Sequence, residues 1–153
     1  MEKAVVVNRE ARAYVLHQQY DKTIFTYPDR DEEHTFTVLE WLNEVTIHYG
    51  SSVNGRIDAF HALTGSYQKA AILLSECSLD IYFPLRGLKA KENIWIYYNK
   101  LITFHSCGNK YTRLIFDKGL TYEVPFDYRT IKAQMHRCKI FIDALRDNYM
   151  VSI

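Results

Sequence analysis

The sequence has few of the residues that mark a multi-domain, secreted or membrane-spanning chain. Its 153 residues include only six glycines and three prolines, which leaves no room for a long flexible linker, so we expect one domain over 1–153. Three scattered cysteines are too few for a disulfide framework, and the N-terminus lacks a signal-peptide hydrophobic region. No apolar run approaches the roughly 18 residues needed to cross a bilayer. These absences predict a cytoplasmic protein that does not enter a membrane.

Catalytic and cofactor-binding motifs are also missing. The sequence contains no phosphate-binding P-loop, no glycine-rich dinucleotide motif, no GxSxG or HExxH motif and no CxxC pair. Two His-x-Cys pairs, His105 with Cys107 and His136 with Cys138, would together offer a zinc-like donor set. The second pair falls on a predicted helix, where residues i and i+2 point about 200° apart and cannot both bind one ion. We therefore predict no metal, no cofactor and no enzymatic activity.

The charge is nearly balanced in total but uneven along the chain. A net charge of +1 argues against a general polyanion binder, yet residues 1–49 carry −4 and residues 50–153 carry +5. Between residues 85 and 116, six lysines and arginines accompany a single acid, Glu92. A local basic surface can attract nucleic acid whatever the total charge. Lysines that protect strand edges would give the same pattern, so both interpretations stay open.

The pattern of apolar residues predicts an α+β fold. Aromatic residues make up 14% of the chain, which favours a β-rich core. Helices are expected over 39–48 and 54–63 from apolar spacing, with Gly50 and Gly65 as stops. The acidic residues 29–33 suggest a solvated turn, and the runs over 94–124 suggest a three-stranded antiparallel meander. The expected strands cover 4–8, 12–17, 22–27, 35–38, 70–74, 80–83, 94–104, 111–116 and 120–124.

A C-terminal amphipathic helix is the clearest predicted element. Pro125 ends the preceding strand, and Asp127 or Thr130 can cap the helix. An apolar stripe then recurs at spacings of three and four: Ile131, Met135, Cys138, Ile142, Leu145 and Tyr149. The neighbouring Ile140 and Phe141 widen the stripe and favour packing on the protein's own sheet. A seam with a second subunit is the alternative.

An ordered series of motifs resembles the ComK family of bacterial competence transcription factors. The series begins with Gly-Ser-Ser-Val-Asn-Gly-Arg at residues 50–56 and includes Trp95-Ile96 and the Phe116 to Pro125 segment. Between and after these lie Lys69-x-x-Ile72, Ile81 to Pro84, Gln134 and Arg137. The chain departs from the family where Ala70-Ala71 replaces a usual Pro-Pro pair and in the residues around Trp95. It also ends soon after the last helix, where some members carry an extension read by a proteolytic adaptor.

The resemblance implies a nucleoid-associated activator of DNA-uptake genes. Its partner would be double-stranded DNA at AT-rich promoter boxes, bound largely through the minor groove by a dimer or dimer of dimers. A proteolytic adaptor is a further possible partner. Together with the basic stretch, the resemblance gives these expected DNA-contacting residues: Ser51, Ser52, Asn54, Arg56, Lys69, Arg86, Lys89 and Lys91. Residues 50–56 also fit a helix cap followed by a turn. The acidic first third keeps a second hypothesis, an interaction module that pairs with a full-length competence factor without binding DNA.

Overall fold

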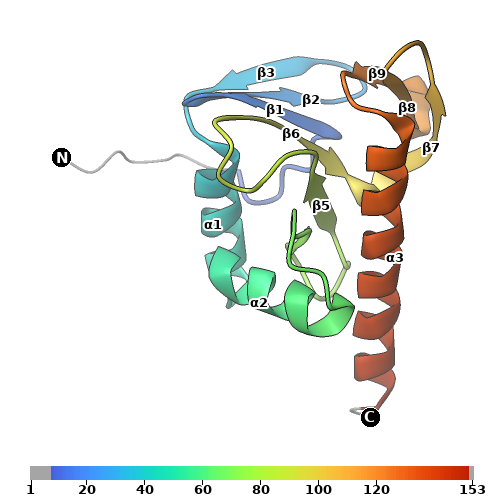
Figure 1. Cartoon of the computed structure of the whole chain (residues 1–153). Coiled ribbons are helices and arrows are strands. Elements are labelled where there is room, and N and C mark those ends of the chain that lie inside the picture. The colour runs from blue at the N-terminus through green and yellow to red at the C-terminus, as the bar shows by residue number, and fades with distance from the viewer. Residues whose placement is uncertain (1–7, 152–153) are drawn as a thin grey trace.

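A computed structural model describes the backbone of residues 8–151 and the side chains of residues 8–147. Within these residues, nine strands form two antiparallel sheets and three helices pack against them (Figure 1). The six-stranded sheet has the order β3-β2-β1-β6-β5-β4, and the three-stranded sheet is the meander β7-β8-β9. This architecture confirms the predicted α+β class.

The elements have the following bounds. The strands of the six-stranded sheet are β1 (Val15–Gln19), β2 (Lys22–Thr26), β3 (Asp31–His34), β4 (Ile72–Leu73), β5 (Ile81–Pro84) and β6 (Glu92–Tyr97). Those of the three-stranded sheet are β7 (Leu101–Ser106), β8 (Thr112–Phe116) and β9 (Thr121–Val124). The helices are α1 (Val38–His48), α2 (Val53–Thr64) and α3 (Tyr128–Val151), with short 3₁₀ turns η1 (Tyr98–Lys100) and η2 (Asp117–Gly119).

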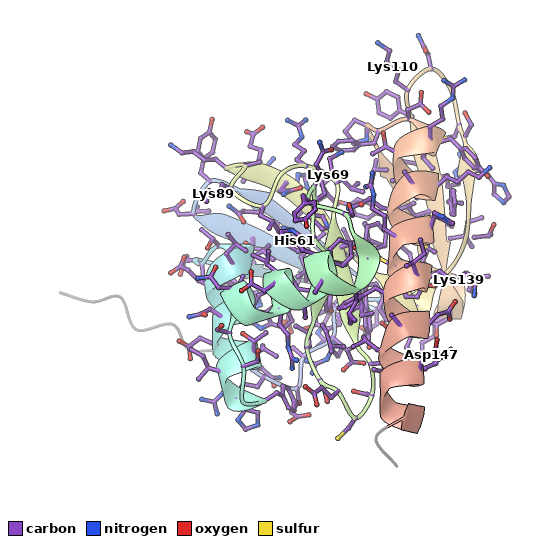
Figure 2. The ribbon with its side chains drawn as sticks, turned by 60° about the horizontal axis from the view of Figure 1, so that its bottom comes forward. His61, Lys69, Lys89, Lys110, Lys139 and Asp147 are labelled. Carbon is purple, nitrogen blue, oxygen red and sulfur yellow. The ribbon has the colours of Figure 1, made fainter. Side chains whose placement is uncertain are left out.

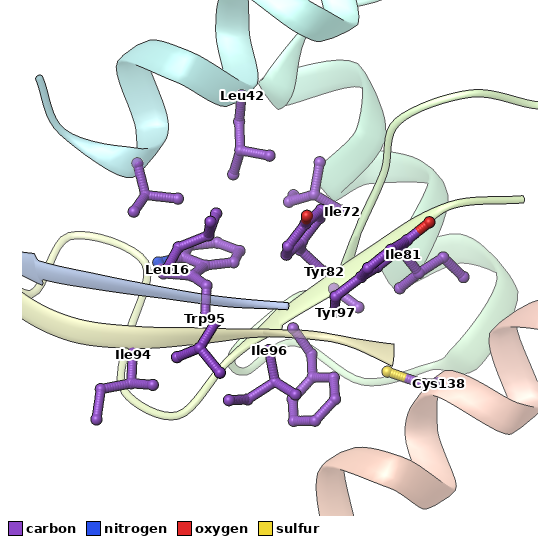
Figure 3. Close-up of a cluster of buried hydrophobic side chains, with 14 of the residues drawn as sticks. Leu16, Leu42, Ile72, Ile81, Tyr82, Ile94, Trp95, Ile96, Tyr97 and Cys138 are labelled. Carbon is purple, nitrogen blue, oxygen red and sulfur yellow. The ribbon is translucent and has the colours of Figure 1, made fainter. Parts of the chain in front are cut away.

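Helix α1 covers one face of the six-stranded sheet and encloses the main core. Figure 3 shows Leu42 of α1 pointing toward Leu16 and Trp95 on neighbouring strands. Trp41 meets the rings of Phe25 and Tyr82 edge-on, with centroids 5.2 and 5.7 Å apart. Since side chains alternate between the faces of a strand, Ile94 and Ile96 lie on the opposite face of β6 from Trp95, as Figure 3 shows.

Helix α3 packs on its own molecule. Ile131, Cys138, Phe141 and Ile142 are buried, and the Phe141 ring meets Phe60 of α2 at a centroid distance of 5.2 Å. The helix also contacts β5 and β7. The intramolecular alternative for this helix is therefore confirmed for the side chains that the structure describes, which do not include that of Tyr149.

Two sequence predictions about strands are wrong. Most of the acidic segment expected to be a turn lies in β3. The strand expected over 35–38 is instead a bend, followed by the N-cap Thr37 and the first residue of α1, and Thr37 forms a capping box with Glu40. Strand β3 pairs only with β2 at the edge of its sheet. Edge strands tolerate charged side chains, so no apolar alternation marked it. The strand expected over 4–8 lies outside the described residues except for Asn8, which is not in a strand.

The apolar run over 94–104 is likewise two strands instead of one. The turn η1 separates β6 from β7, so the meander covers residues 101–124 and β6 belongs to the other sheet. Asn99 fixes this turn, because its Oδ1 accepts from the backbone N–H of Ile81 at 2.9 Å and its Nδ2 donates to the Leu79 carbonyl at 2.9 Å. The register of β7 and β8 pairs Ser106 with Thr112 and His105 with Arg113, so these two strands are neighbours as the predicted meander requires.

Candidate nucleic-acid interface

The Gly-Ser-Ser-Val-Asn-Gly-Arg segment connects α1 to α2. Gly50 has a φ of +82°, a conformation that favours glycine, and its N–H donates to the Ile47 carbonyl at the end of α1. Ser52 is the N-cap of α2, and its Oγ accepts from the N–H of Gly55 at 3.0 Å. A Cβ on Gly55 would lie 3.1 Å from the Ser51 hydroxyl oxygen. The cap-and-turn interpretation thus accounts for much of this motif.

Arg56 does not lie at the surface. It is only 6% exposed, and its guanidinium donates to Glu76 Oε1 at 3.1 Å and to the buried Leu74 carbonyl at 3.2 Å. The expectation that Arg56 is an exposed contact residue is therefore corrected. Helix α2 turns the side chain inward, where it joins the helix to the segment that follows β4. Of the other expected residues here, Asn54 is exposed and Ser51 and Ser52 are half-buried.

The remaining expected contact residues come from two segments that α3 holds together. Gln134 of α3 is buried, and its Nε2 donates to the carbonyls of Lys69 at 3.1 Å and Pro84 at 2.7 Å. These bonds bring Lys69 close to the β5–β6 loop of residues 85–91. The Arg86 guanidinium lies over the Phe126 ring, 5.4 Å from its centroid, just before α3 begins.

The β5–β6 loop is held in one shape by a buried asparagine. Asn93 Oδ1 accepts from the N–H of Arg86 at 2.9 Å, and its Nδ2 donates to the Gly87 carbonyl at 3.0 Å. The Lys91 carbonyl accepts from the N–H of Tyr20 at 2.8 Å, which ties the loop to the β1–β2 turn. The exposed Lys89 and Lys91 therefore project from a supported loop, beside an open and mainly apolar pocket of about 450 Å³.

Several cations on this part of the molecule are not neutralised by a neighbour. Five of them, which we call the basic surface, form no ion pair with any side chain of residues 8–147: Lys69, Arg86, Lys89, Lys91 and Lys110. In the view of Figure 2, Lys69 lies between Lys89 and Lys110, which is at the tip of the β7–β8 hairpin. By contrast, Arg113 in the same hairpin is paired with Glu123 at 2.9 Å.

Lys110 was not among the expected contact residues. It belongs to the basic run over 85–116, and the Gly108-Asn109 turn that precedes it was visible in the sequence. Arg129 and Lys132 of α3 are further exposed cations that were not among the expected contact residues. Arg86 lies close to the start of α3 only through its packing on Phe126, and such tertiary packing leaves no local signal in the sequence.

No metal-ligand set appears in the described part of the chain. No three His, Cys, Asp or Glu side chains of the described residues gather where they could hold an ion. Cys138 is buried in the core, and that burial raises the pKa of its thiol. In addition, no helix among the described residues has the length and apolar character to cross a membrane.

Comparison with known proteins places the chain in a family. No curated protein and no solved structure matches it. The family model described as ComK protein matches residues 3–149 of the 153. That match covers both sheets, all three helices except the end of α3, and the basic surface. The chain therefore belongs to the ComK family, a family of competence transcription factors.

Proposed function

We propose that the protein is a sequence-specific DNA-binding activator of DNA-uptake genes. It recognises AT-rich promoter boxes largely through the minor groove, as a self-associated protein acting on the nucleoid in the cytoplasm. The observation that carries the proposal is the basic surface, whose five cations have no carboxylate partner among the described side chains. An ion pair with the protein would have to be broken before a cation could bind a phosphate.

The shape of the basic surface is consistent with contact to a duplex. Lys89 and Lys91 project from a loop whose backbone Asn93 holds in one shape, so little backbone entropy is lost when phosphates bind. Lys110 extends from a narrow two-stranded hairpin. The minor groove over A/T tracts is narrow and strongly negative, and it attracts lysine and arginine. A few such cations suffice, which reconciles DNA binding with a net charge of only +1.

The connection between α1 and α2 has a smaller part in this proposal. Ser51, Ser52 and Asn54 remain candidate phosphate contacts, since hydroxyl and amide groups commonly bind phosphate oxygens. Arg56 is assigned a structural role instead. It anchors α2 through Glu76 and Leu74 and so fixes the position of the serines.

The salt dependence of binding to an AT-rich duplex tests the basic surface. Each phosphate contact contributes about 0.9 to the slope of log K against log salt. The double variant K89Q/K91Q should therefore flatten the slope by about two units. A matched control, K22Q/K139Q, removes the same charge from two lysines that already pair with Glu33 and Asp143. The control should leave the slope unchanged, and equal slopes for all three proteins would overturn the assignment.

Groove choice and self-association need separate measurements. A small-molecule ligand of AT minor grooves should displace the protein from an AT-rich duplex, and a GC-rich duplex of equal length should bind more weakly. Sedimentation with and without the duplex should reveal a dimer or a dimer of dimers. A protein that remains monomeric in both conditions contradicts the self-association part. A proteolytic adaptor as partner would be detected as degradation that depends on the adaptor.

A further inference from the structure

Helix α3 carries a half-buried arginine, Arg137, that the basic surface does not include. Its Nη1 donates to Gln134 Oε1, three residues earlier on the helix, at 2.5 Å. Gln134 is itself buried, and its Nε2 donates to the carbonyls of Lys69 and Pro84. The guanidinium of Arg137 is therefore held by an amide group whose own orientation is fixed by two backbone carbonyls.

No carboxylate neutralises this guanidinium. Arg137 forms no ion pair with any side chain in the part of the chain that the structure describes. Its own helix cannot supply one, because the positions three and four residues away hold only uncharged side chains: Ala133, Gln134, Ile140 and Phe141. The Gln134 oxygen is neutral, so the hydrogen bond to it leaves the positive charge of Arg137 in place.

The other arginines that the fold withdraws from solvent are each paired with an acid. Among the described side chains, the buried or half-buried arginines are Arg12, Arg56 and Arg137. Arg12 donates to Asp80 Oδ2 at 2.9 Å. Arg56 donates to Glu76 Oε1 at 3.1 Å. Because a charge loses hydration as it is withdrawn from water, an opposite charge is needed to compensate it. An anion from outside the chain would supply the partner that Arg137 lacks.

The position of Arg137 indicates the kind of anion. Gln134 links its guanidinium to the carbonyl of Lys69, a residue of the basic surface. Figure 2 shows Lys69 next to α3. A guanidinium has five N–H donors in a planar fork, and the bond to Gln134 uses one of them. The remaining donors suit phosphate oxygens, which accept two parallel N–H bonds. A phosphate of bound DNA is the anion that the neighbouring basic surface would bring here.

We propose that Arg137 binds a phosphate of the DNA backbone and extends the basic surface from Lys69 onto α3. This inference rests on the proposed DNA binding and adds to it a residue whose geometry is set before DNA arrives. Because Gln134 already holds the guanidinium, little side-chain entropy is lost when the phosphate binds. Arg137 thereby fixes how α3 lies against the duplex, without reading the bases.

A salt titration of binding to an AT-rich duplex tests this role. Arg137→Gln should weaken binding about tenfold or more, the loss expected for one charge-assisted hydrogen bond to phosphate. It should also lower the slope of log K against log salt by about 0.9. Lys139→Gln is the matched control on the same helix, since Lys139 already pairs with Asp143 at 3.3 Å, and it should bind like the wild type. The melting temperature of each variant is measured as well, because Arg137→Gln deprives Gln134 Oε1 of its donor.

Ala133→Glu supplies the missing carboxylate without altering Arg137. Residue 133 is exposed and lies four positions before Arg137, which is the favourable order for an ion pair on a helix. The new carboxylate should neutralise the guanidinium and reduce both affinity and salt slope as Arg137→Gln does, with a melting temperature unchanged or higher. Ala133→Gln, an uncharged side chain of the same size, should bind like the wild type. Added to Arg137→Gln, Ala133→Glu should weaken binding little further, whereas general repulsion of DNA would weaken it again.

Failure of this inference is distinguishable from failure of the proposed function. A wild-type chain that does not bind the duplex overturns both. Duplex binding by the wild type, with affinity and slope unchanged in Arg137→Gln, overturns only the role of Arg137, whatever the melting temperature of the variant. A further loss when Ala133→Glu is added to Arg137→Gln does the same. If inorganic phosphate raises the melting temperature of the wild type but not of Arg137→Gln, while duplex binding is equal in both, Arg137 holds a free anion and the DNA contact is overturned.

Discussion

Substitution of Arg56 by alanine should destabilise the fold, although the sequence suggested a surface residue there. The side chain is 6% exposed and donates to Glu76 and to the Leu74 carbonyl. Truncation leaves the buried Leu74 carbonyl without this donor, which costs about 1–3 kcal/mol. The loss of buried methylenes adds about 0.8 kcal/mol for each group. Glu76 is more than half exposed, so the ion pair itself contributes little. The expected loss in the free energy of unfolding is about 3 kcal/mol.

Thermal and urea unfolding measure this loss. For a protein of this size, about 3 kcal/mol corresponds to a fall in melting temperature of roughly 6–12 °C. Glu76→Gln retains an acceptor for Arg56 and should cost under about 1 kcal/mol. Asn54→Ala, in the first turn of the same helix but exposed, should have little effect on stability. The reasoning fails if Arg56→Ala melts like the wild type and instead binds AT-rich DNA more weakly, since Arg56 would then act at the surface.

Three further predictions follow from the burial of other side chains. Ile142→Ala should lower the free energy of unfolding by about 2–5 kcal/mol. The loss should be the same at every protein concentration, because the residue packs within its own molecule. A loss that grows on dilution would indicate a dimer seam. In the native protein, the exposed Cys77 should react readily with iodoacetamide, whereas the buried Cys138 should not. Mass spectrometry measures both reactions. Equal alkylation rates for the two cysteines would contradict the burial of Cys138. Burial raises the pKa of Tyr14 and of Tyr27 to about 12. The unfolded chain loses these protons first, near pH 10. The contribution of these two tyrosines to stability should therefore be constant below pH 10, and the stability of the protein should fall as the pH rises from 10 toward 12. Urea unfolding followed by circular dichroism measures this, and unchanged stability between pH 10 and 12 would refute it.

Elements with strong local signals could be predicted from the sequence, and elements defined by distant partners could not. The helices have apolar spacing and caps, and the turns of the meander contain Gly108 and Gly119, so these elements were correctly placed. Strand β3 has no such signal, because an edge position leaves its acids in solvent. The division of the 94–104 run at η1 depends on bonds from Asn99 to Leu79 and Ile81.

The candidate site residues likewise divide into those with a local signal in the sequence and those whose place depends on distant partners. Lys89 and Lys91 lie in a loop that the sequence marked as basic, and they are exposed. The burial of Arg56 depends on Leu74 and Glu76, which are 18 and 20 positions along the chain. A cavity of about 680 Å³ beside Tyr97 is lined by residues as far apart in the chain as Arg12 and Lys118, so no local pattern could reveal it.

The pairing of β1 with β6 has a consequence for the order of folding. The segments it joins are far apart in the chain, as the bond between Gln18 and Lys91, 73 positions apart, illustrates. Closing such a loop costs roughly 2–3 kcal/mol more in chain entropy than closing a hairpin of a few residues. The β1–β2–β3 hairpins and the β7–β8–β9 meander need no such closure. We therefore expect these two units to form early and β6 to join them late. The basic loop before β6 and the cavity beside Tyr97 at its other end would then be completed in the same final step.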